Sequence, residues 1–194
     1  MARLGLVRGR YEARLAEGPE DVAAAQRLRH QVFRADRNAP DSAADGLDRD
    51  AFDARCDHML LFERKTGDLV CCFRLMPLSS GAEIAESYSA QYYELSKLRE
   101  FPGPMVEMGR FCIHSDHRNA DALRVAWAAM TQYVDERGFE LMFGCSSFEG
   151  NDAEVYLDAF AFLQERHIAP KRWLPRVKAP KVFKFAKKLA ARRA

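Results

Sequence analysis

Apolar residues follow strand-like and helix-like spacings in turn along the chain, and this pattern predicts a layered α/β fold. Short apolar runs bounded by turn residues are typical of strands, and they fall at 11–16, 59–62, 69–76, 105–113 and 141–145. The turn at 65–68 joins the second and third of these runs into a hairpin. A hairpin followed by strand, helix, strand and helix predicts a mixed sheet with helices packed on it.

Three segments between these runs are expected to be helices. The first opens at Pro19, with Glu20 and Asp21 in its first turn, where acidic residues favour the positive helix end. The second spans 118–137, ends before Gly138 and carries an apolar stripe of Leu123, Trp127, Met130 and Val134. The third spans 153–166 and carries Val155, Ala159, Phe162 and Leu163. We expect these faces to be buried, together with the short strand at 141–145.

Length and composition favour one soluble domain. The chain has 194 residues, of which 48% are hydrophobic and 30% charged, and these values are ordinary for a globular protein. No apolar run approaches the roughly 20 residues needed to cross a bilayer, and no apolar signal core follows the basic N-terminus. We expect one domain at 1–170, a basic C-terminal tail at 171–194, and a cytoplasmic location.

The cysteines and histidines indicate neither disulfides nor a metal site. The five cysteines include no CxxC pair, and most of them, Cys145 included, lie in apolar strand-like segments that predict packing. His114 and His117 have HxxH spacing, but no third ligand is nearby in the sequence. We therefore expect no bound metal.

Positive charge is concentrated at the C-terminal end. Residues 166–194 hold eleven Lys or Arg and no Asp or Glu, which leaves 19 basic and 28 acidic residues, a net charge of −9, in the rest. An acidic body with a basic end predicts an anionic partner there, either an acidic carrier protein, an anionic membrane surface or nucleic acid. The simpler alternative is a solvated tail. Nucleic acid is the least expected partner, because the acidic body opposes it.

Several charged residues lie where apolar neighbours make them candidates for chemistry. Arg29 and Phe33 are one helical turn apart and share a face. Asp48, Asp50 and Asp53 place three acids in six residues of a polar loop, which is either a binding site or a solvated patch. Arg74 lies inside an apolar strand, so it needs a partner or must face a cleft.

Glu107 and Arg110 are the most informative pair. Positions three apart in a regular strand point to opposite faces, but Gly109 lies between them, and glycine inside a strand often marks a bulge. A bulge shifts the alternation and lets both side chains face one cleft. The alternative is an edge strand with one of the two residues solvated.

These charged positions resemble the signature of a known enzyme family. The acyl-homoserine-lactone synthases carry a similar set, with Glu usual where this chain has Asp48. Other segments resemble a sister family more closely, the ornithine acyl-carrier-protein N-acyltransferases of ornithine-lipid synthesis; these segments are 52–58, 108–114, 116–119 and 141–148. The last segment, Leu-Met-Phe-Gly-Cys-Ser-Ser-Phe, is the most specific, since it lies outside the signature that both families share.

The resemblance implies a GNAT-like α/β fold, a mixed sheet flanked by helices, and N-acyl transfer from acyl carrier protein to the α-amine of ornithine. It implies Glu107 as base and Arg110 beside it as the catalytic pair. The substrate-binding residues that it implies are Arg29, Phe33, Asp48, Asp50, Asp53, Arg74, Phe143 and Ser146. No bound cofactor is implied, because acyl-phosphopantetheine on the carrier is the donor.

One departure from acetyl-CoA-dependent relatives favours a carrier-bound donor. Those proteins follow the central strand with a glycine-rich turn whose N–H groups approach a pyrophosphate. The matching stretch here, 118–123, has Asp121 in place of a glycine, and its carboxylate repels a pyrophosphate. We expect Arg118, Arg124 and the basic tail to meet an acidic carrier instead.

Two alternatives remain at this point. One is homoserine-lactone synthesis from S-adenosylmethionine, against which the 141–148 segment argues. The other is a non-catalytic GNAT-like domain whose basic end contacts a membrane peripherally, with Phe183, Phe185 and Leu189 interleaved among the cations.

Overall fold

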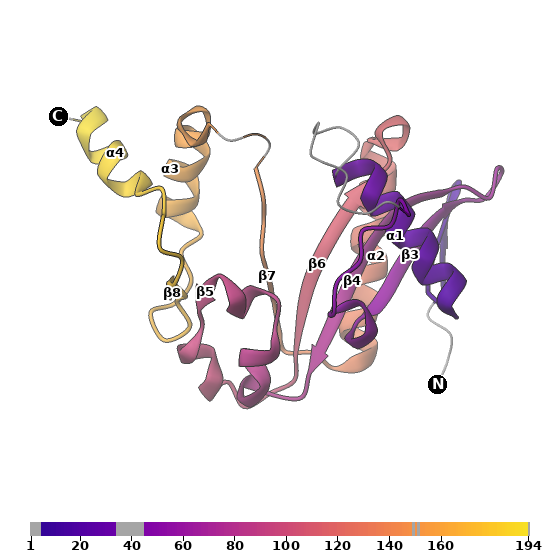
Figure 1. Ribbon diagram of the computed structural model, residues 1–194, viewed down its shortest axis with the longest axis horizontal. Helices are drawn as coiled ribbons and strands as arrows, with labels where there is room; N and C mark the ends of the chain where they lie inside the picture. Colours follow the sequence, from indigo (N-terminus) through magenta and orange to yellow (C-terminus); the bar gives the residue numbers. More distant parts are fainter. Residues whose placement is uncertain (1–4, 34–44, 149, 151, 194) are drawn as a thin grey trace. The chain divides into compact units, whose positions relative to one another are not determined.

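Six strands form one sheet in the order β1-β2-β3-β4-β6-β7 (Figure 1). The computed structural model describes residues 5–33, 45–148, 150 and 152–193. It divides into two compact units, the first built from 5–79 and 103–143 and the second from 80–102 and 144–193. The strands of the sheet are β1 Gly5–Arg8, β2 Tyr11–Leu15, β3 Asp57–Glu63, β4 Leu69–Leu78, β6 Met105–Ile113 and β7 Leu141–Gly144.

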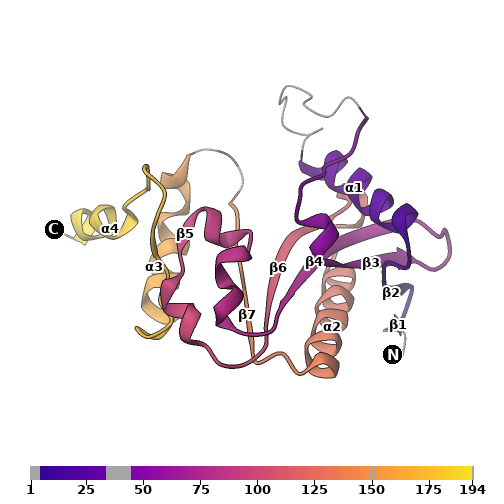
Figure 2. The same ribbon diagram turned by 60° about the horizontal axis from the view of Figure 1, so that its bottom comes forward.

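The first five strands of the sheet are paired antiparallel, and one helix covers each face (Figure 2). Helix α1, Pro19–Phe33, packs Ala25 and Leu28 against a small cluster that includes Leu60 and Cys72. Helix α2, Ala120–Arg137, covers the opposite face and closes the main core. Alternate residues of β3 and β4 therefore enter one cluster or the other, as the period of two along a strand requires.

The sequence predicted most of this sheet. The strands expected at 59–62, 69–76 and 105–113 are confirmed, and so is the hairpin turn at 65–68 between the first two. The pattern missed β1, because four residues with one glycine and one arginine give no apolar alternation. Strand β1 pairs with β2 through a tight turn in which Gly9 has φ of +56°, a conformation that favours glycine. The composition of residues 36–50 also predicts a polar loop, and its residues up to 44 lie outside the described part of the chain.

The buried face of α2 differs from the prediction. Leu123 and Trp127 are 41% and 44% exposed, and the residues that pack on the sheet are Ala122, Val125, Ala126, Ala129, Met130 and Tyr133. The predicted stripe was therefore half right: Met130 is buried and Val134 packs half-buried against the core, while Leu123 and Trp127 lie on the outer side and alanines take the positions against the sheet. Gly138 ends the helix at φ of +67°, as expected.

The short strand β7 and Cys145 also differ from the prediction. β7 is half-buried to exposed along its length, and Cys145 lies beyond its end and is exposed. The expectation of a buried strand that packs Cys145 is wrong, because β7 is the last strand in the sheet order and has a neighbour on one side only. Cys71, Cys72 and Cys112 are buried as expected.

The second unit consists of short elements. The 3₁₀ segments Gly81–Glu86, Ser89–Gln91 and Ser96–Glu100 lead into and out of β5, Tyr93–Glu94, which pairs with β8, Arg176–Val177. Helices α3, Leu157–Arg166, and α4, Phe185–Arg193, pack together, with Phe160 in contact with the rings of Phe148, Tyr156, Phe183 and Phe185. The basic segment 171–194 thus contributes β8 and α4, and the domain boundary at residue 170 stays a prediction.

The expected apolar face of the helix at 153–166 is partly wrong. Val155, Phe162 and Leu163 are 68%, 52% and 41% exposed. The first turns of that segment form a 3₁₀ helix, Ala153–Tyr156, whose tighter winding changes the phase of the side chains, and Leu157 is the buried residue of α3. Among the described residues, no helix is both long and apolar enough to cross a bilayer.

Candidate active site

A bulge in β6 determines how the site is built. Gly109 pairs with Arg74 and Cys112 pairs with Cys72, so two residues of β6 lie opposite the single residue Phe73. This is the bulge that the sequence predicted near Gly109. The residue in the left-handed region is its neighbour Arg110, with φ of +53°. A non-glycine residue held at positive φ is uncommon and often marks a functional position.

The bulge brings the predicted pair to one face of the sheet. Glu107 lies opposite Met76 and Gly109 opposite Arg74, so Glu107 is on the face where Arg74 projects. Beyond the bulge, the Arg110 side chain reaches Asp50, which Arg74 also binds. Phe111 is turned to the other face, where it stacks on Phe73 at 5.4 Å.

Three arginines and three aspartates form one ion-pair network on this face. Arg29 binds Asp53 with two parallel hydrogen bonds of 2.8 Å, from Nη1 to Oδ1 and from Nη2 to Oδ2. Its Nη2 also donates to the Asp48 carbonyl, and its Nε lies 3.2 Å from Asp48 Oδ2. The fork of a guanidinium matches a carboxylate in this bidentate manner.

Arg74 and Arg110 complete the network. Arg74 donates from Nη1 to Asp50 Oδ1 at 2.6 Å and from Nη2 to Asp50 Oδ2 at 2.9 Å, and its Nη1 also reaches Asp53 at 2.9 Å. Arg110 lies 3.3 Å from Asp48 and 3.2 Å from Asp50. The network therefore ties the loop before β3 to α1, β4 and β6.

Burial is uneven across the network. Arg29, Asp48, Asp53 and Arg74 are all buried. The side chains of Asp50 and Arg110 are 22% and 28% exposed, so they form the end that solvent and ligands can reach. Glu107 is buried, with 4% of its surface exposed.

The arginines hold the carboxylates in their charged form. Burial alone raises the pKa of Asp53, but hydrogen bonds and charge from Arg29 and hydrogen bonds from Arg74 and Gln26 outweigh it and hold that pKa well below its usual range. Burial likewise opposes the ionisation of Asp50, and Arg74 outweighs it, so the pKa of Asp50 is also lowered. Both carboxylates are ionised at neutral pH.

The sequence did not single out two further members of the site. Gln26 donates from Nε2 to Asp53 Oδ2 at 3.0 Å, and His58 donates from Nε2 to the Asp53 carbonyl at 3.0 Å. Burial lowers the pKa of His58, so the ring is neutral at pH 7. Gln26 precedes Arg29 by three positions on one helix face, and this spacing was the available signal.

The other predicted site residues lie outside this network. Phe33 ends α1 and packs half-buried on the cluster beneath that helix. Phe143 is half-buried in β7, and Ser146 is exposed in the second unit. Arg118 and Arg124 are exposed at the N-terminal end of α2.

With this geometry established, the chain can be compared with known proteins. Residues 28–128 match the family model described as Acetyltransferase (GNAT) domain. The L-ornithine N(alpha)-acyltransferase of Rhodobacter capsulatus is 34% identical over 176 residues, which cover 87% of this chain and 68% of that protein. The chain belongs to the GNAT acyltransferase family.

Further comparisons agree with membership of the GNAT family. The L-ornithine N(alpha)-acyltransferase of Brucella abortus is 28% identical over 85% of this chain and 62% of its own length. The chain spans about 58–68% of the length of the four curated relatives that it matches. The crystal structure of the AHL synthase LasI aligns with a TM-score of 0.51 at 20% identity, covering 69% of this chain and 71% of that one. The GNAT-like mixed sheet flanked by helices is therefore confirmed.

Proposed function

We propose that this GNAT acyltransferase moves a (3-hydroxy)fatty acyl group from acyl carrier protein to the α-amine of L-ornithine, giving lyso-ornithine lipid. The observation that carries the proposal is the 34% identity to an L-ornithine N(alpha)-acyltransferase across 87% of the chain. The matched region contains the network of Arg29, Asp50, Asp53, Arg74 and Arg110 that ties the loop to the sheet.

The chemistry is aminolysis of a thioester. Glu107, directly or through a water, takes a proton from the acceptor ammonium, and the freed amine attacks the thioester carbonyl carbon. The attacking nitrogen then loses a second proton, the carbon–sulfur bond breaks, and one of the two protons passes to the leaving thiolate while the other is released to solvent. A backbone N–H of the bulge at 109–111 stabilises the oxyanion of the tetrahedral intermediate. Arg110, through its ion pairs with Asp48 and Asp50, holds the bulge in the conformation that keeps this N–H and Glu107 on one side of the sheet.

The exposed end of the network suits the acceptor. Asp50 has the most exposed side chain of the three aspartates in the network, and we assign to it the δ-ammonium of ornithine. To Arg110, which lies 3.2 Å from Asp50, we assign the acceptor carboxylate. Arg29, Asp53 and Arg74 act through these two as positioning residues, because with Asp48 they form the buried part of the network, where two arginines balance two aspartates. Asp48 joins Arg29 to Arg110 in the same manner.

Donor and location form the outer part of the proposal. Acyl carrier protein is the donor, since Asp121 occupies the place where a pyrophosphate-binding glycine stands in acetyl-CoA-dependent relatives. The basic segment from 171 onward contacts an anionic membrane surface peripherally, near the place where an acylated amino acid is delivered.

A product assay by mass spectrometry tests the function. Purified protein is incubated with 3-hydroxyacyl carrier protein, and separately with acyl-CoA, against a panel of amino acids and S-adenosylmethionine. Acyl-ornithine that forms from the carrier alone supports both donor and acceptor. A lactone product from S-adenosylmethionine, or no product from any pair with folded protein, overturns the proposal.

A further inference from the structure

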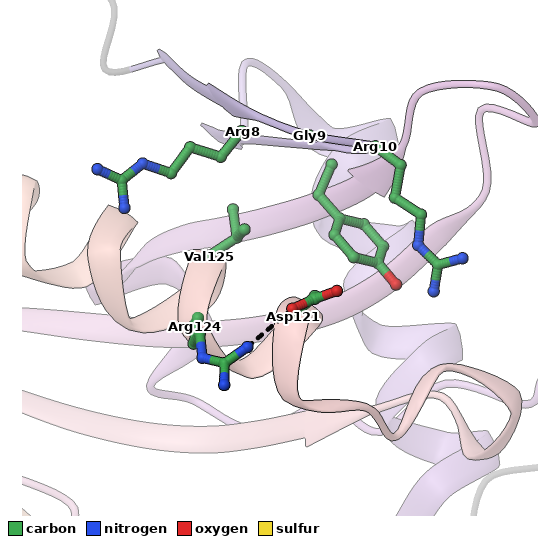
Figure 3. A pocket seen from close by; sticks show the side chains of 7 residues that line it. Arg8, Gly9, Arg10, Asp121, Arg124 and Val125 are labelled. Carbon is green, nitrogen blue, oxygen red and sulfur yellow. Dashed lines mark hydrogen bonds and ion pairs between the residues drawn. The ribbon is translucent and has the colours of Figure 1, made fainter.

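The turn between β1 and β2 and the first part of α2 line a cavity that plays no part in the site above (Figure 3). Its volume is 240 Å³, and the residues that line it are Arg8, Gly9, Arg10, Tyr11, Asp121, Arg124 and Val125. Three of these seven residues are arginines and one is acidic. A cavity with this composition attracts an anionic ligand.

The local fold explains how three arginines come to line one cavity. Arg8 pairs with Tyr11 across the two strands, so both side chains lie on the face that α2 covers. The turn at Gly9 places Arg10 beside them, with its guanidinium carbon 5.0 Å from the centre of the Tyr11 ring. Arg124 comes from the helix, one turn after its start (Figure 3).

The positive charge in this cavity is only partly balanced. Arg124 binds Asp121 at 2.9 Å, and Arg10 lies 4.0 Å from Glu63. Arg8 forms no ion pair with another described residue. All three arginines are exposed, and the lining itself has an excess of two positive charges.

The chemistry of the lining indicates what binds there. Asn119 Oδ1 accepts from the backbone N–H groups of Asp121 and Ala122 at 3.1 and 2.9 Å, so the first turn of α2 is already capped and is not a phosphate cradle. Val125 and Tyr11 are the only large apolar residues of the lining, which is too few for insertion into a membrane. Three exposed guanidiniums, two from the β1–β2 hairpin and one from α2, fit several carboxylates spread over a protein surface.

We propose that Arg8, Arg10 and Arg124 form the docking site for an acidic helix of the acyl carrier protein. This inference rests on the proposed function for the choice of partner. The sequence predicted a donor contact at Arg124. The inference adds Arg8 and Arg10, which lie at the β1 edge of the sheet.

A binding measurement with charge reversal tests the docking site. Fluorescently labelled acyl carrier protein is titrated with Glu107→Gln protein, so that no turnover disturbs the equilibrium. We expect Arg8→Glu together with Arg10→Glu to raise the Kd roughly tenfold at low salt, and Arg124→Glu to raise it further. The matched control is Arg27→Glu, at an exposed arginine of α1, which is expected to leave the Kd within about twofold.

Two further measurements separate docking from folding and from catalysis. In the otherwise wild-type chain, Arg8→Glu with Arg10→Glu is expected to leave kcat/KM with acyl-pantetheine, a donor without the protein, unchanged. Carrier variants with Glu→Lys changes on one helix are expected to restore affinity to the reversed enzyme. An unchanged Kd, or equal weakening by Arg27→Glu, overturns the docking site. Absence of acyl product from wild-type enzyme overturns the proposed function instead, while carrier binding still decides the docking site.

Discussion

Asp53 holds more of the network together than any other residue. It accepts hydrogen bonds from Arg29, Arg74 and Gln26, and its backbone carbonyl accepts from His58. Removing one partner of a buried ion pair leaves the other charge uncompensated and costs about 3–5 kcal/mol. Asp53→Asn is therefore expected to lower the free energy of unfolding by about 3 kcal/mol, measured by urea denaturation.

The control for this change lies in the same loop. Asp45→Asn breaks an exposed ion pair with Arg49 and is expected to change stability by less than about 1 kcal/mol. Equal effects of the two substitutions on the free energy of unfolding would show that burial of the network contributes nothing.

The pH dependence of stability gives an independent check of the network. Because the pKa values of Asp50 and Asp53 are lowered from 3.8 in the folded state, their contribution is complete above about pH 4 and is lost as the pH falls further. The free energy of unfolding is therefore expected to fall less steeply with decreasing pH, below about pH 4, in Asp53→Asn than in the wild-type protein.

Glu107 supplies the base in the proposed reaction. Glu107→Gln keeps the shape of the side chain and removes its ability to take a proton, so kcat is expected to fall at least about 100-fold. The melting temperature checks that the variant is folded, and Glu12→Gln, at an exposed position of β2, is the control. Near-normal turnover in folded Glu107→Gln protein would remove Glu107 as the base.

At the scale of single elements, the bulge in β6 was predictable and its details were not. The glycine among apolar strand residues indicated a bulge near 109, and the pairing places it there. Sequence could not show that Arg110 takes the left-handed conformation, because that depends on its bonds to Asp48 and Asp50 from a loop 60 residues away. The expectation that Leu123 and Trp127 are buried failed for a similar reason. Which residues of α2 contact the sheet depends on how the helix packs, and the small alanines allow the closest approach.

The strained backbone at Arg110 gives a test of the bulge itself. Arg110→Gly and Arg110→Ala both remove the guanidinium, but glycine adopts φ of +53° without strain and alanine does not. We expect the glycine variant to be more stable than the alanine variant by about 1 kcal/mol, measured by chemical denaturation. An alanine variant as stable as the glycine variant would mean that the bulge relaxes when the side chain is lost. Both variants are expected to lose acyl transfer.

For the chain as a whole, the sequence was most informative where the core is continuous. The apolar run of β4 is buried almost throughout, and those of β3 and β6 are buried or half-buried at every position, so their pattern identified them directly. Residues 80–102 form three 3₁₀ segments and a two-residue strand, which have no distinctive period. The ion-pair network combined both cases: its members were recognisable as charges in apolar surroundings, but their partners were fixed only by the fold.

The segregation of charge along the chain leads to the last prediction. The segment 171–190 presents exposed cations next to Val182 and Phe183, which are 41% and 37% exposed. Each such cation near an anionic bilayer contributes about 1 kcal/mol. The protein is therefore expected to sediment with vesicles that contain phosphatidylglycerol and not with vesicles of pure phosphatidylcholine. Salt at about 0.5 M is expected to release it, because this ionic strength screens the attraction between the cations and the anionic lipids.

Two double variants test whether the basic segment makes the contact. Lys181→Gln with Lys184→Gln is expected to weaken vesicle binding roughly tenfold. Arg27→Gln with Lys65→Gln, in the acidic body, is expected to leave vesicle binding unchanged. Equal binding to both vesicle types, or equal losses in the two double variants, would show that the basic segment is only a solvated surface.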